Sequence, residues 1–145
     1  MPDPEYTPMH KLAIGKRHEF LIWARLLQAE FDVFPSMVDD KGIDGIVGFK
    51  GKYFEIQIKS GENWANQRGF GEAVLKVNPE RLYVVFNYTT DEIRYFRADQ
   101  ILTEEAWQES IRWNIPQIKL PKALLEKYKT QDWDGFVRYL KGDPA

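Results

Sequence analysis

The amino-acid sequence predicts one α/β domain with a central mixed sheet of four to five strands flanked by helices. Three observations support this: a long amphipathic segment near the N-terminus, strand-like runs between residues 43 and 97, and helical segments towards the end of the chain. The 145 residues suffice for one hydrophobic core. We therefore expect a single domain over residues 1–145, in which residues 1–10 form a loose N-terminal arm.

The first helix is predicted over "KLAIGKRHEFLIWARLLQAEF", because apolar residues recur on it at helical spacing: Leu12, Ile22, Trp23 and Leu26. Residues 43–49 and 53–59 predict two strands joined by a tight turn at Lys50 and Gly51. The order of these elements places a helix directly before a β-hairpin.

The second half of the chain predicts two more strands and further helices. "RLYVVF" is almost continuously apolar, which is typical of a strand covered on both faces, and "EIRYFR" follows it after a turn through Thr90 and Asp91. Thr103 is suited to cap a helix, and Pro121 is placed to open another, "PKALLEKY". "WDGFVRYL" predicts a short last helix.

The predicted hairpin brings polar residues together on one face. Counting outward from the two-residue turn pairs Ile46 with Glu55 and Asp44 with Gln57, and residues opposite each other share a face. The polar face then holds Asp44, Glu55, Gln57 and Lys59. The other face holds Ile43, Val47, Phe54, Ile56 and Ile58, and we expect it to lie in the core.

This polar face has the donor types that hard divalent cations prefer. Asp44 offers a carboxylate, Gln57 an amide oxygen, and the backbone carbonyl after Gln57 a further oxygen, so Mg²⁺ or Mn²⁺ is the expected cofactor. Lys59 beside such a cation could orient an attacking water or offset charge on a phosphate. A solvent-facing strand with charges on one side is the alternative interpretation.

A further carboxylate, Glu19, lies on the apolar stripe of the first helix, three residues before Ile22 and four before Trp23. A charged residue on a core-facing stripe is costly unless it is paired or bound to a metal. If the helix packs on the polar end of the hairpin, Glu19 joins the same site. The alternative is a residue at the edge of the stripe that reaches solvent or Lys16.

An acid on a first helix, then "GIDGIV", then "IQIKSG" resembles the PD-(D/E)XK nuclease superfamily, and in particular its Mrr-like branch, in which glutamine replaces the usual acid. The resemblance implies a restriction endonuclease-like fold and divalent-metal-dependent hydrolysis of DNA. It makes Asp44 the main metal ligand, Gln57 the second ligand, Lys59 the catalytic lysine and Glu19 the supporting acid. Glu55, on the same face, is a further candidate ligand.

Candidate contacts to nucleic acid lie on either side of this motif: Lys16, Arg17, Trp64, Gln67 and Arg68. A domain this small has little surface to grip a duplex, so a homodimer is the expected form. The absence of cysteine and of an apolar N-terminal segment is consistent with a cytoplasmic protein without a membrane span. Two alternatives to a nuclease remain: a catalytically inactive relative that binds nucleic acid or a protein partner, and a purely structural domain.

Overall fold

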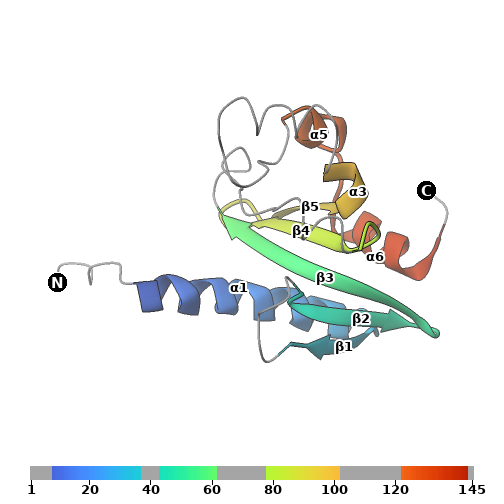
Figure 1. Cartoon of the computed structure of the whole chain (residues 1–145), viewed down its shortest axis with the longest axis horizontal. Coiled ribbons are helices and arrows are strands. Elements are labelled where there is room, and N and C mark those ends of the chain that lie inside the picture. Colours follow the sequence, from blue (N-terminus) through green and yellow to red (C-terminus); the bar gives the residue numbers. More distant parts are fainter. Residues whose placement is uncertain (1–7, 37–42, 62–77, 102–121, 144–145) are drawn as a thin grey trace.

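The computed structural model describes residues 8–36, 43–61, 78–101 and 122–143, which form one five-stranded sheet with helices on both faces (Figure 1). The strands lie in the sheet in their order along the chain: β1 Asp32–Pro35, β2 Gly45–Phe49, β3 Lys52–Gly61, β4 Leu82–Asn87 and β5 Glu92–Arg97. β3 runs parallel to β4, and the other three pairs are antiparallel. The predicted α/β class with a mixed sheet is confirmed.

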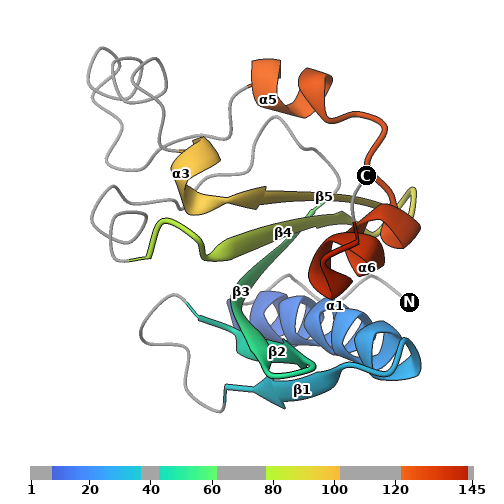
Figure 2. The ribbon, with the colours of Figure 1, turned by 90° about the vertical axis from the view of Figure 1, so that its right-hand side faces the viewer.

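The helices form a layer on each side of the sheet (Figure 2). They are α1 Pro8–Gln28, α3 Ala98–Ile101, α5 Lys122–Lys127 and α6 Trp133–Lys141. Side chains of α1 and α6 share one buried cluster with β2, β3 and β4. Side chains of α3 and α5 pack on a second cluster, on the opposite face of β4 and β5. The six residues of β4 are all buried, so the prediction of a strand covered on both faces is confirmed.

The hairpin of β2 and β3 has the predicted register. Val47 lies opposite Phe54 and Ile46 opposite Glu55. Lys50 and Gly51 form the turn with φ values of 49° and 80°, and this left-handed conformation suits a two-residue hairpin turn. The predicted register therefore holds over the paired part of the hairpin, from Gly45 and Ile56 to Phe49 and Lys52.

Helix α1 packs across the hairpin through its apolar stripe. Ile22, Trp23 and Leu26 are buried, as predicted. A Cβ atom added to Gly45 would lie 2.8 Å from two ring carbons of Trp23, so glycine lets the indole pack directly on the backbone of β2. The helix begins at Pro8, inside the segment that the sequence analysis assigns to the N-terminal arm.

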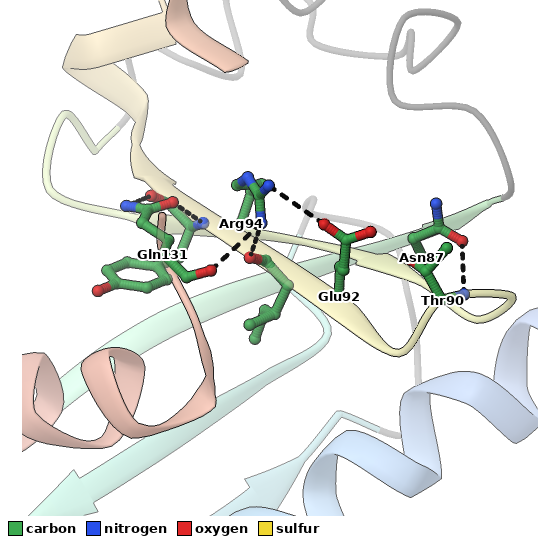
Figure 3. Close-up of polar contacts among 7 residues, drawn as sticks. Asn87, Thr90, Glu92, Arg94 and Gln131 are labelled. Carbon is green, nitrogen blue, oxygen red and sulfur yellow. Dashed lines mark hydrogen bonds and ion pairs between the residues drawn. The ribbon is translucent and has the colours of Figure 1, made fainter. Parts of the chain in front are cut away.

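The open edge of β5 is closed by a side chain that precedes α6. The Oε1 atom of Gln131 accepts a hydrogen bond from Tyr95 N, and its Nε2 atom donates to Tyr95 O, both at 3.0 Å (Figure 3). The side chain of Arg94 donates to the carbonyl oxygens of Ile93 and Gln131 and pairs with Glu92. These bonds satisfy edge groups that would otherwise be open to pairing with another strand.

Two parts of the prediction differ from the structure or fall outside it. Strand β1 was not predicted, because its four residues show no alternation of polar and apolar side chains. Thr103 and Pro121 lie outside the described residues. None of the helices in the described part of the chain is long and apolar enough to cross a membrane.

Candidate metal and nuclease site

Asp44 lies where β2 and β3 separate, and it is fastened to β3 by two hydrogen bonds. Its backbone N–H donates to Ile56 O at 2.8 Å, and its Oδ2 atom accepts from Ile58 N at 2.6 Å. These two groups lie on either side of Gln57 in the sequence. The Asp44 side chain is therefore held beside the segment from Ile56 to Ile58, and it is almost fully buried, with 4% exposure. The strand pairing ends at Gly45 and Ile56, so the pairing of Asp44 with Gln57 stays a prediction.

Gln57 brings an oxygen that the described residues leave unsatisfied. Its Oε1 atom is buried and has no hydrogen-bond partner among those residues. A buried amide oxygen without a partner costs free energy, on the order of 1–3 kcal/mol. A cation held jointly with the Asp44 carboxylate would satisfy this oxygen.

Lys59 follows two residues after Gln57 on the same face of β3, roughly 6–7 Å along the strand. Gln57 and Lys59 lie opposite Tyr83 and Val85 of β4, both of which belong to the second buried cluster. The sequence analysis expected only one face of the hairpin to border a core. In the structure, the polar groups of β3 lie beside a second core, so they are partly shielded from water.

Glu19 lies on α1, which packs against the opposite face of the sheet from Gln57 and Lys59. It is 8% exposed, and it bonds within its own helix: Oε1 accepts from Trp23 Nε1 at 3.4 Å, and the carboxylate pairs with Lys16 Nζ at 3.3 Å. The indole ring of Trp23 bonds to Glu19 and packs on Gly45, so it lies between Glu19 and the backbone next to Asp44. Glu19 thus pairs with Lys16, as the second alternative predicts, although its carboxylate is almost fully buried.

Glu55 is held in a different set of contacts. Its Oε2 atom accepts hydrogen bonds from Asn78 Nδ2 at 3.0 Å and from Arg81 Nε at 3.1 Å. The Asn78 hydrogen bond lowers the pKa of Glu55, the bond and charge of Arg81 add to this effect, and partial burial opposes it. The carboxylate thus neutralises a buried arginine and connects β3 to the start of β4.

Replacing Glu55 by glutamine should change the acid sensitivity of the fold. Because the folded-state pKa of Glu55 lies below its usual value of 4.5, its ionised form stabilises the protein above that pH, and this contribution disappears as the pH falls towards the folded-state pKa. We expect urea unfolding at pH 6 and pH 3 to show a smaller loss of stability for Glu55→Gln than for the wild type. An equal loss in both proteins would contradict this role.

His18 lies near the site, and no role was predicted for it. Its Nδ1 atom lies 3.2 Å from Ser60 Oγ, next to Lys59, and its ring stacks on Tyr88 with 4.4 Å between the ring centroids. Burial lowers the pKa of His18, and the charge of Arg17 lowers it further. His18 thus joins α1 to the end of β3. The spacing of His18 on the helix does not predict these contacts, because Ser60 on β3 and Tyr88 in the turn after β4 lie far away along the chain.

The candidate nucleic-acid contacts are only partly described. Trp64, Gln67 and Arg68 lie outside the described residues. Lys16 is half-exposed and paired with Glu19. Arg17 lies on the exposed face of α1, roughly 160° around the helix from Glu19, so the structure does not bring it together with the site.

The site contains few of the side chains that commonly bind metal ions. Within the described residues, no three histidine, aspartate or glutamate side chains gather closely enough to hold a metal ion. A site built from Asp44, Gln57 and backbone oxygens contains only one such residue. Metal binding at this site would therefore depend on the neutral amide oxygen of Gln57, at a position where an acidic side chain would bind a cation more strongly.

Comparison with solved structures confirms the predicted restriction endonuclease-like fold. One similar structure is that of Hjc, a Holliday junction resolvase from the archaeal hyperthermophile Archaeoglobus fulgidus. It superposes with a TM-score of 0.61, covering 90% of this chain and 98% of that chain. The sequence identity is 13%, so the likeness concerns the fold. No protein-family model and no curated protein sequence matches this chain.

Proposed function

We propose that this protein is a divalent-metal-dependent endonuclease that hydrolyses phosphodiester bonds in DNA. The observation that carries the proposal is the 2.6 Å hydrogen bond from Ile58 N to Asp44 Oδ2. This bond fastens a buried carboxylate to the short segment that carries both Gln57 and Lys59. An acid, an amide oxygen and an ammonium group thus share one end of the hairpin.

The donor set fits Mg²⁺ or Mn²⁺. Carboxylate, amide and carbonyl oxygens are the ligands that these cations take from proteins, usually together with water and substrate phosphate. Asp44 and Gln57 would hold the ion, because a carboxylate can accept several partners and the buried Gln57 oxygen lacks one among the described residues. When bound, the cation would polarise the phosphate and lower the pKa of a bound water.

Lys59 would carry out the chain's own part of the chemistry. Hydrolysis adds the oxygen of a water molecule to phosphorus and breaks the bond to the leaving oxygen, and negative charge grows on the phosphate oxygens. An ammonium group on the same face as Gln57 can orient the water and neutralise this charge. Glu19 supports the site indirectly, by holding Trp23 against Gly45 beside Asp44.

The fold supports a DNA substrate, because one similar structure is that of a Holliday junction resolvase. The homodimer is part of the proposal. The alternative function is a domain that binds nucleic acid or a protein without cleaving. This alternative is favoured by the neutral Gln57 and by the absence of a three-acid group within the described residues. A nuclease should gain stability from the metal and should cleave DNA only with metal, whereas a binding domain should do neither.

Replacing Lys59 by methionine should reduce cleavage at least about a hundredfold while leaving metal binding intact, because the variant loses the charge near the phosphate. Cleavage of linear, supercoiled, branched and single-stranded DNA with Mg²⁺ or Mn²⁺ would measure this, and thermal unfolding with and without metal would measure binding. Lys52→Met, at an exposed position on the same strand, is the matched control and should cleave as the wild type does. If the wild type cuts none of these substrates and gains no stability from metal, the nuclease proposal is wrong.

A further inference from the structure

Lys59 lies between two residues of β3 that are each bonded to another element. Before it, Ile58 N donates a hydrogen bond to Asp44 Oδ2 at 2.6 Å. After it, Ser60 Oγ forms a hydrogen bond with Nδ1 of His18, on α1, at 3.2 Å. β2 pairs only with the first part of β3, so within the described residues the end of β3 has β4 as its one strand partner. These two bonds therefore add to a strand end that is paired on one side.

We propose that His18 is a positioning residue for the cleavage reaction: through Ser60 it fixes the end of β3, and with it the ammonium group of Lys59 relative to the phosphate. Lys59 and Ser60 are adjacent in a strand, so their side chains point to opposite faces. His18 thus acts through the backbone of β3 and not on the substrate. The inference rests on the proposed function, in which Lys59 acts on the phosphate.

The ring of His18 is itself held in place by packing. It stacks on Tyr88 with 4.4 Å between the ring centroids and 17° between the planes, and it meets Phe86 edge-on at 6.3 Å. Phe86 lies directly opposite Ser60 in the pairing of β3 with β4. The turn that carries Tyr88 is ordered by Asn87, whose Oδ1 atom accepts hydrogen bonds from two backbone N–H groups of that turn at 3.0 and 3.3 Å. A side chain locked by packing can hold its hydrogen-bond partner in one position.

Neighbouring residues of α1 thus reach both strands of the candidate site. His18 bonds to β3 beside Lys59. Glu19 bonds to the indole of Trp23, which packs on the backbone of β2 at Gly45. One turn of α1 therefore connects the strand that bears the lysine with the strand that precedes it in the sheet.

Two variants remove the hydrogen bond from its opposite ends. His18→Phe keeps an aromatic ring against Tyr88, and Ser60→Ala removes the hydroxyl. Each should lower kcat at least about tenfold, because a small misplacement of a catalytic group slows the reaction, while KM and the stabilisation by Mg²⁺ stay unchanged. The double variant should lose no more than either single variant, since both changes break the same bond. Ser60→Thr keeps the hydroxyl and should recover most of the kcat that Ser60→Ala loses.

The matched control is Asp91→Asn, which weakens a second attachment of α1 to the sheet. Asp91, in the turn after β4, pairs with Arg25 of α1 at 2.7 Å. Asparagine suits the left-handed backbone of this position, where φ is 60°. Because this ion pair joins α1 to the turn and not to β3, we expect Asp91→Asn to keep the kcat of the wild type. A kcat lowered as much as in His18→Phe would mean that any loosening of α1 slows cleavage, and it would overturn the specific role of His18.

Hydrogen exchange tests the positioning without cleavage. In His18→Phe and Ser60→Ala, the backbone amides of Lys59 and Gly61 should exchange about fivefold faster than in the wild type, as expected for the loss of one hydrogen bond. The amide of Phe54, in the hairpin, should exchange at the wild-type rate. A wild type that cuts no DNA would overturn the proposed function, and faster exchange would still establish that His18 holds this end of β3. Unchanged exchange at these amides, or a wild-type kcat in both variants of an active enzyme, would overturn the inference.

Discussion

Replacing Asp44 by asparagine should abolish both the stabilisation by Mg²⁺ and the cleavage of DNA, while changing the unfolding free energy without metal by only about 1 kcal/mol. Asparagine keeps an oxygen that can accept the hydrogen bond from Ile58 N, so the junction of β2 and β3 stays intact. It lacks the negative charge that a divalent cation requires. We expect the cleavage rate to fall at least about a hundredfold.

Replacing Asp44 by alanine separates the structural role of this residue from its role in binding metal. Alanine leaves the Ile58 N–H without its acceptor in a site that is almost fully buried, which should cost about 1–3 kcal/mol. Urea unfolding in EDTA measures this cost, and repeating it with Mg²⁺ measures the metal effect. If Asp44→Asn still gains stability from Mg²⁺, the metal does not bind at this carboxylate.

Replacing Gln57 by glutamate should make the fold depend strongly on metal. The side chain keeps its shape, but a second carboxylate then lies beside Asp44 in a partly buried position, so the variant should be less stable in EDTA by about 1–3 kcal/mol. With Mg²⁺ or Mn²⁺ the added charge should increase affinity about tenfold, because carboxylates hold these ions better than amides. Calorimetric titration and thermal unfolding would measure the two effects.

Gln57→Met is the opposing control for this experiment. It removes the buried oxygen that has no partner among the described residues, so it should be neutral or stabilising in EDTA and should lose the response to metal. If Gln57→Glu and the wild type respond equally to metal, Gln57 is not a ligand. The inactive-relative alternative would then account better for the site.

Much of this fold can be predicted from local sequence patterns, because the alternation of a strand and the apolar spacing of a helix each depend on residues of that one element. The alternation of β3 and the two-residue turn at Lys50 and Gly51 determine the hairpin register, and the helical spacing of Ile22, Trp23 and Leu26 determines which side of α1 is buried. Strand β1 had no comparable signal. Its four residues pair with β2 through backbone groups, and this pairing requires no particular side chains.

The site was predictable only in part for the same reason. The register predicts that Asp44 lies opposite Gln57, and the observed strand pairing extends as far as Gly45 and Ile56. The register does not predict that the carboxylate of Asp44 accepts a hydrogen bond from Ile58, because this bond depends on how far β2 and β3 separate. The partner of Glu55 is Arg81, 26 residues further along the chain, and no local pattern relates the two.

The sequence by itself determined which side chains share a face, because periodicity is a property of each strand or helix. Only the tertiary structure decided which face each helix covers, because that choice depends on packing between distant segments. It placed Glu19 and α1 on one side of the sheet and Gln57 with Lys59 on the other. It also left Phe20, Leu21 and Leu27 exposed, since the sheet can bury only one side of α1.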